Sequence, residues 1–153
     1  MSKITAVGCL FLAIFVGVQL KCILVGVQLK CGESVTVQIT NRLNMRYLAV
    51  QCKDKHNDLG LQQLNVGETY SFKFEPQIIL PTTLYFCHFV WLEGDHYFDI
   101  YVQTRDTFCS NKGSTCIWDI FPTGPCCTNK DPRQCYGWNP PSAAQQSNNT
   151  LLV

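Results

Sequence analysis

The sequence predicts an all-β protein, a small disulfide-braced β-sandwich of about seven to eight antiparallel strands. In several short segments apolar and polar residues alternate with a period of two, the pattern of half-buried strands. Turn-forming residues recur every ~8 to 12 positions, and no segment shows the period of an amphipathic helix. With 153 residues, 46% of them hydrophobic, the chain is large enough for one domain and too small for two.

The alternation is clearest at residues 35–40 and 70–75, where every second side chain is apolar. Residues 84–92 are apolar on both faces, which predicts a central strand of a two-layer fold. Residues 76–81 begin and end with proline and predict a turn, because proline cannot donate to a β-ladder. The expected strands are 35–40, 47–52, 60–66, 70–75, 84–92, 97–102 and 116–121, with a short edge strand at 136–138.

The N-terminal segment predicts a secretory leader. Lys3 precedes an apolar run at 4–18, which has the length of a signal peptide core and is shorter than a transmembrane helix. A signal anchor and a buried core helix are the alternatives. The heptapeptide Val-Gly-Val-Gln-Leu-Lys-Cys occurs at 16–22 and again at 25–31, and we expect cleavage near 22–31. The predicted organisation is a leader at 1–31, a β-sandwich at 34–138 and a disordered polar tail at 139–153.

The charge of the mature chain excludes one class of partner. Lys3, Lys21 and Lys30 all lie in the leader, which leaves nine Lys/Arg against eleven Asp/Glu, a difference of −2. Such a balance provides no basic surface for nucleic acid or for an anionic membrane. We expect a secreted, extracellular protein that binds no nucleic acid and does not span a membrane once the signal is removed.

Seven cysteines follow the leader. Secretion places them in an oxidising compartment, where disulfides form and persist. Because seven is odd, either one thiol is free or Cys31 remains in the mature chain. No Cys-x2-Cys knuckle is present, so the disulfide interpretation is preferred to a zinc site.

The histidines and paired carboxylates do not predict an enzyme. His56, His88 and His96 do not lie in a recognisable catalytic segment, and we interpret His88 as a packed residue and the other two as solvated. Glu93 and Asp95 are two positions apart, as a glycosidase pair would allow, but turn and solubility roles are simpler. No Gly-x-Ser-x-Gly, phosphate loop or His-Glu-x-x-His motif occurs. We expect no catalytic residues, no metal and no cofactor.

Several segments occur in a characteristic order. They are Val50-Gln51-Cys52, Asp58-Leu59-Gly60, Phe72-Lys73-Phe74, the run from Thr83 to Trp91 that contains Cys87, Phe98-Asp99-Ile100-Tyr101, Cys109 and Cys116-Ile117-Trp118. Their order and spacing resemble those of the plant self-incompatibility S-protein homologues, over residues 34–138. The resemblance implies a secreted β-sandwich, a role in cell-cell recognition and two disulfides among four cysteines.

Those four cysteines are Cys52, Cys87, Cys109 and Cys116. Three connectivities are open. The hairpin about Gly94 returns the chain toward Cys87, which favours Cys87–Cys109 with Cys52–Cys116. Outside this set, Cys135 is a candidate to pair with Cys126 or Cys127 and so fix the C-terminal segment.

The leading hypothesis is a recognition ligand that binds a cell-surface receptor through polar loops on a rigid scaffold. We expect a monomer. The alternative is a secreted carbohydrate-binding or antimicrobial defence protein. Asn148, in the sequence Asn-Asn-Thr, is a predicted glycosylation site. The predicted contact residues are Lys53, Asp54, Lys55, His56, Asn57, Asp58, Glu93, Asp95 and His96, and the loop at 104–115 is a further candidate.

Overall fold

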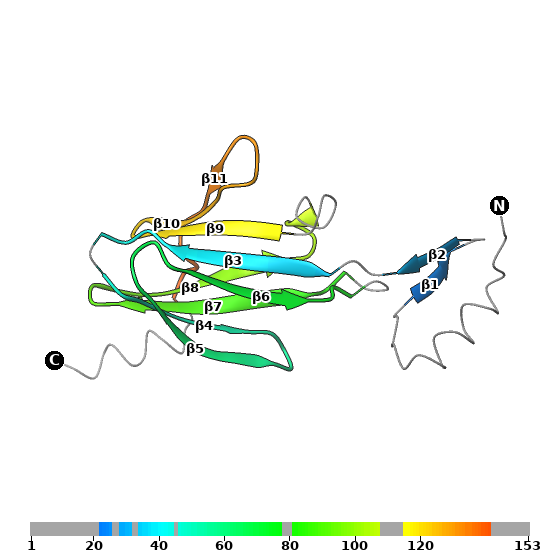
Figure 1. Ribbon diagram of the computed structural model, residues 1–153, viewed down its shortest axis with the longest axis horizontal. Helices are drawn as coiled ribbons and strands as arrows, with labels where there is room; N and C mark the ends of the chain where they lie inside the picture. Colours follow the sequence, from blue (N-terminus) through cyan, green and yellow to red (C-terminus); the bar gives the residue numbers. More distant parts are fainter. Residues whose placement is uncertain are drawn as a thin grey trace.

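The computed structural model describes residues 22–25, 28–31, 34–44, 46–77, 81–107 and 115–141. The elements that it defines there are strands in two stacked layers, with a separate N-terminal hairpin (Figure 1). The hairpin pairs β1 (Cys22–Val25) with β2 (Gln28–Cys31). The all-β sandwich predicted from the sequence is therefore confirmed.

One layer is a five-stranded sheet in the order β11-β10-β9-β3-β6, and the other is a four-stranded sheet in the order β5-β4-β7-β8. The first contains β3 (Val35–Asn41), β6 (Thr69–Phe74), β9 (Thr115–Phe121), β10 (Gly124–Cys127) and β11 (Gln134–Cys135). The second contains β4 (Leu48–Lys53), β5 (Asp58–Leu64), β7 (Leu84–Trp91) and β8 (Gly94–Val102).

The core lies between the two sheets and is formed by alternate residues of their strands. On β3 the side chains of Val35, Val37 and Ile39 are fully buried, as the sequence alternation predicts. Val50 and Phe89 face them from the other sheet, and Trp118 is the largest side chain that is fully buried. Burial of such apolar side chains is the main contribution to the stability of the sandwich.

Two features of the sheets differ from the sequence prediction. The pairing of β3 with β9 is parallel, whereas every other strand pair in the described residues is antiparallel. The two sheets contain nine strands, because β10 and β11 extend the first sheet. The sequence Gly-Pro-Cys-Cys of β10 has no alternation, so its strand character was not predictable from pattern alone.

Residues 136–138 were expected to form an edge strand and instead form a strap across the open side of the sandwich. The Tyr136 backbone N–H donates to the Pro125 carbonyl, and the Asn139 N–H donates to the Tyr97 carbonyl, each at 2.9 Å. Gly124 permits this crossing: its φ is +137°, and a Cβ there would lie 2.0 Å from the Tyr136 carbonyl oxygen. The rest of the predicted tail, from residue 142, lies outside the described residues.

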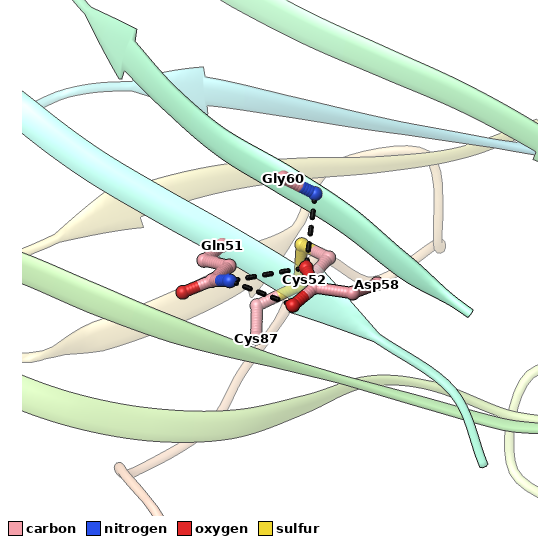
Figure 2. The surroundings of a disulfide bond; sticks show 5 residues. All are labelled: Gln51, Cys52, Asp58, Gly60 and Cys87. Carbon is pink, nitrogen blue, oxygen red and sulfur yellow. Dashed lines mark hydrogen bonds between the residues drawn. A yellow bond between two sulfur atoms is a disulfide. The ribbon is translucent and has the colours of Figure 1, made fainter. Parts of the chain in front are cut away.

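The disulfides correct the predicted pairing. Cys52 is bonded to Cys87, with their Cα atoms 4.0 Å apart, because β4 and β7 are neighbours and these two residues are register partners (Figure 2). The predictions Cys52–Cys116 and Cys87–Cys109 are therefore wrong. Cys116 is also disulfide-bonded, and Cys109 lies outside the described residues.

The prediction for the C-terminal cysteines is confirmed. Cys126 on β10 is bonded to Cys135 on β11, its register partner. This bond closes the base of a turn that projects from the sheet (Figure 1). Cys127 is a free thiol among the described residues, fully buried, and burial raises the pKa of that thiol. A buried thiol with a raised pKa is unreactive.

Candidate functional site

The strand directions collect the connecting turns at two opposite ends of the sandwich (Figure 1). We call the end formed by residues 53–58, 75–77 and 103–106 the cleft end. We call the end formed by residues 42–47, 65–68 and 92–93 the apolar end. The eight residues of β7 run between them, a length of about 26 Å for a strand.

This arrangement separates the predicted contact residues into two groups. Residues Lys53 to Asp58 connect β4 to β5 at the cleft end, whereas Glu93, Asp95 and His96 lie in and beside the β7–β8 turn at the apolar end. One compact partner site cannot contain both groups.

At the cleft end the structure has a cavity of ≈ 380 Å³. One side is the loop that carries Asp54, Lys55 and His56, and the other is formed by residues that follow β6 and begin β7. Its size falls in the range of ligand-binding sites in proteins. The lining residues beyond the loop are Phe74, Glu75, Gln77, Thr82, Thr83, Leu84, Tyr85 and Phe86.

Asp54 fixes the shape of the loop. Its Oδ1 accepts hydrogen bonds from the backbone N–H groups of His56 (2.7 Å) and Asn57 (2.5 Å), which is an Asx turn. Its carboxylate also hydrogen-bonds with the Asn57 side chain and with the Tyr85 hydroxyl. Burial opposes ionisation, but these bonds outweigh it and hold the pKa of Asp54 below its ordinary value.

Lys53 and Asp58 close the loop at its base. The Lys53 ammonium lies 2.8 Å from Asp58 Oδ2, and the Asp58 carboxylate also accepts hydrogen bonds from the Gln51 side chain and the Gly60 backbone N–H (Figure 2). These donors, Lys53 first, lower the pKa of Asp58 to about 2. Lys53, Asp54, Asn57 and Asp58 are therefore occupied with one another or with the sheet.

Lys55 and His56 differ from their neighbours in the loop. Within the described part of the chain, neither the Lys55 ammonium nor the His56 ring has a hydrogen-bonding or ionic partner, and both side chains line the cavity. A charged group and a titratable ring are thus held on a rigid turn without an internal role. This arrangement is typical of side chains that contact a ligand or partner.

The opposite wall of the cavity is equally well fixed. The Gln103 side chain donates to the Gln77 carbonyl (2.6 Å) and accepts from the Thr83 N–H (3.1 Å), and the Gln77 N–H donates to Thr83 Oγ1 (2.9 Å). Phe74 and Tyr85 pack beneath this network with ring centroids 4.4 Å apart. Burial, followed by the bond to Asp54, raises the pKa of Tyr85 to about 12, so its hydroxyl stays protonated.

The turn that follows β8 is fixed by a buried ion pair. Arg105 Nη2 lies 2.7 Å from Asp106 Oδ2, and Asp106 is fully buried. The Arg105 guanidinium lies 5.1–5.3 Å from the ring centroids of Phe98, Trp118 and Tyr136, which are cation–π distances. Arg105 and Asp106, which belong to the candidate contact loop at 104–115, therefore stabilise the fold. Residues 108–114 lie outside the described residues.

The predicted contact residues Glu93 and Asp95 at the apolar end also form ion pairs within the chain. Glu93 forms a two-point ion pair with Arg46, and Asp95 Oδ1 lies 2.7 Å from His88 Nε2, so the two carboxylates do not face a shared substrate position. His88 also stacks on Tyr97, with ring centroids 4.2 Å apart, which agrees with the packed role expected for it.

His96 corrects the expectation of a solvated side chain. Its ring stacks on Trp138 at 4.8 Å and is half-buried, because the C-terminal strap covers it. This contact was not predictable from local sequence, because 42 positions separate the two residues. Asn148, the predicted glycosylation site, lies outside the described residues.

The rigid loop over a cavity is an arrangement that suits binding. No group of three or more His, Cys, Asp or Glu side chains there is placed to hold a metal ion. Within the same residues, no helix has the length and apolar character needed to cross a bilayer.

Comparison with known proteins places these features in a family. The model of the family described as plant self-incompatibility protein S1 matches residues 36–138. S-protein homolog 2 of Arabidopsis thaliana is 44% identical over 110 residues, which cover 68% of this chain and 68% of that protein. S-protein homolog 3 of the same plant is 41% identical over 111 residues, which cover 69% and 73%.

A solved structure supports the same fold. It is described as that of SPH (Self-Incompatibility Protein Homologue) proteins, a widespread family of small, highly stable, secreted proteins from plants. The TM-score is 0.53 at 19% identity, over 71% of this chain and 97% of that one. At this identity the likeness concerns the fold alone.

Proposed function

The chain belongs to the plant self-incompatibility protein S1 family, and we propose that it is a recognition ligand that binds a cell-surface protein through its cleft end. Members of this family are secreted plant proteins, and this chain is extracellular. Within that setting the question is which surface contacts a partner.

The observation that carries the proposal is the contrast within one loop. Lys53, Asp54, Asn57 and Asp58 bond with one another and with the sheet, whereas Lys55 and His56 face the cavity and have no partner among the residues that the structure describes. Holding the loop rigid before binding reduces the conformational entropy that is lost on association. The two unpartnered side chains then provide the polar contacts.

The chemistry of the cavity favours a protein partner. Its walls combine apolar side chains, among them Phe74 and Leu84, with Lys55 on one side and Glu75 on the other. A partner that inserts an apolar side chain flanked by one acidic and one basic group would complement the apolar walls, Lys55 and Glu75 together. A sugar-binding site needs an open aromatic face. Of the three rings that line the cavity, Tyr85 is only 5% exposed, and Phe74 and Phe86 are half-buried.

The experiment is a binding measurement with the secreted full-length chain on intact plant cells. We expect saturable binding that is lost when surface proteins are removed by protease and that persists after glycosidase treatment. The double variant Lys55→Ala/His56→Ala should bind about tenfold more weakly or worse, as loss of central interface contacts does. Its thermal unfolding should be unchanged, because neither side chain has an internal partner.

Lys73→Ala is the matched control. Lys73 is an exposed lysine on β6, outside the cavity lining, so its removal changes the net charge by the same step as removal of Lys55. Equal binding by the double variant and the unmodified chain would refute the role of the cleft. Binding that survives protease but disappears after glycosidase, with robust signals on a glycan array, would favour the carbohydrate-binding alternative.

A further inference from the structure

The apolar end carries an unusual group of exposed side chains. Leu92 is 81% exposed, Tyr47 67% and Val66 54%. They belong to three different connections, β3–β4, β5–β6 and β7–β8, which are separated in sequence and meet only in the folded chain. The other two exposed large hydrophobic residues among those described are Leu61 on β5 and Leu84, which lines the cleft.

Asn41 holds two of these connections together. It is fully buried, and its side-chain amide donates to the carbonyls of Arg46 (2.8 Å) and Leu64 (3.0 Å). Its backbone carbonyl accepts from the Gly67 N–H at 2.8 Å, and its N–H donates to the Glu68 carbonyl at 3.0 Å. The residues next to Tyr47 and Val66 are thus fixed by one buried side chain and its backbone.

An ion pair joins the third connection, the β7–β8 turn, to the β3–β4 connection. The Arg46 guanidinium donates through Nε to Glu93 Oε2 (3.1 Å) and through Nη2 to Glu93 Oε1 (2.5 Å). A two-point contact of this kind fixes orientation as well as distance. Because Arg46 precedes Tyr47 and Glu93 follows Leu92, the pair places these two exposed side chains on neighbouring turns.

The charges at this end are acidic in balance. Three guanidinium groups, Arg42, Arg46 and Arg133, the last over the Phe121 ring, stand against four carboxylates, Glu68, Glu93, Asp95 and Asp119, a difference of −1. Arg42 is already paired with Asp119 at 3.0 Å. Such a surface repels an anionic membrane or nucleic acid and is complementary to a partner with basic residues around its contact site.

The size of the exposed apolar area further limits which molecule can bind the apolar end. Together the three side chains expose on the order of 400 Å² of mostly apolar surface, about half of what each partner of a stable symmetric dimer buries. End-to-end pairing with a second copy of the chain would also bring two acidic ends together, which like-charge repulsion disfavours. Three projecting apolar groups on rigid turns fit better into a concave apolar surface.

We infer that the apolar end is a second docking surface, which inserts Tyr47, Val66 and Leu92 into an apolar pocket of a protein partner whose rim carries Lys or Arg. The surface lies opposite the cleft end and does not depend on the function proposed for the cleft. One molecule could then hold two proteins at once, about a strand length apart.

The test is site-specific photocrosslinking with the secreted full-length chain on intact plant cells. A benzophenone amino acid replaces Tyr47 in one variant, Leu92 in a second, and Leu61 in a control. Leu61 is 68% exposed, as Tyr47 is at 67%, but lies on β5 away from the apolar end. Mass spectrometry then identifies the attached molecule and the attached peptide.

We expect positions 47 and 92 to capture the same protein, at a site with apolar residues flanked by Lys or Arg, and position 61 not to capture it. With that protein purified, Leu92→Ser and Tyr47→Ser should each weaken binding about tenfold. Leu61→Ser and Lys55→Ala/His56→Ala should leave it unchanged. The last comparison separates failure of this inference from failure of the proposed cleft function.

Four results would overturn the inference. They are attachment to lipid, attachment to another copy of the chain, equal capture from position 61, and no capture at either test position. Binding by the purified partner that is insensitive to Leu92→Ser and Tyr47→Ser would overturn it as well.

Discussion

The two ends of the sandwich are built from the same strands and have opposite characters. The cleft end is a hollow in which Lys55 and His56 have no partner within the described part of the chain. The apolar end projects hydrophobic side chains, and Arg42 and Arg46 there form ion pairs. Both ends are rigid, one through the half-buried Asp54 and the other through the fully buried Asn41. The difference indicates that a small two-layer fold can present two unlike surfaces without enlarging its core.

Removal of the Cys52–Cys87 disulfide should have the largest effect on stability, and it should loosen the cleft end first. The bond closes a segment with a sequence separation of 35, and the chain-entropy model gives about 3–4 kcal/mol for such a loop. We expect Cys52→Ala/Cys87→Ala to lower the free energy of unfolding in denaturant by that amount. Faster hydrogen exchange should appear at residues 53–58 before it appears at 42–47.

The Cys126–Cys135 bond is the matched control, since its separation is only 9 and the predicted loss is roughly 1 kcal/mol smaller. An equal or larger loss from Cys126→Ala/Cys135→Ala would contradict this dependence of the stabilisation on the length of the closed loop.

The residues that fix the two ends should differ in their contribution to stability. Asn41→Ala leaves the carbonyls of Arg46 and Leu64 and the N–H of Leu43 without their partner at a buried position. We expect a loss of about 2–4 kcal/mol in the free energy of unfolding. Asn57→Ala removes an exposed contact with Asp54 and should cost less than about 1 kcal/mol. Similar losses in the free energy of unfolding for Asn41→Ala and Asn57→Ala would contradict the expected difference between the buried and the exposed contact.

The smallest expected effect is a pH dependence confined to the cleft end. The folded pKa of Asp58, about 2, is below its ordinary value of 3.8, so the ionised carboxylate favours the folded loop above pH 3.8. This contribution is lost as the pH falls from 3.8 toward 2. An NMR titration of the Asp58 carboxyl carbon should give a midpoint near 2 and should shift upward in Lys53→Ala. A midpoint near 3.8 in the unmodified chain would contradict the contacts described for the loop base.

Sequence reasoning succeeded where the signal is local. The alternation that begins at Val35 places Val35, Val37 and Ile39 in the core, and the polar run at 53–58 marks an exposed loop. It failed on the main disulfides because a cross-strand bond requires knowing that β4 and β7 are neighbours, which the chain order does not reveal.

The candidate sites show the same difference between features with a local sequence signal and features that depend on which strands are neighbours. The loop side of the cleft was predicted, but the wall formed by Phe74, Glu75 and Leu84 was not, because it depends on which strands meet. Tyr47, Val66 and Leu92 stand at the ends of three predicted strands, 19 and 26 positions apart, and nothing in their local sequence marks them as one surface.

The central claim is that recognition occurs at the ends of the sandwich and not on its sheet faces. Hydrogen exchange of the full-length chain, free and bound to plant cell-surface membranes, tests it most directly. The account predicts slowed exchange at 53–58 and 75–77, with the central residues of β7 and β8 unchanged. Protection across the outer face of β7 and β8, with none at either end, would contradict it.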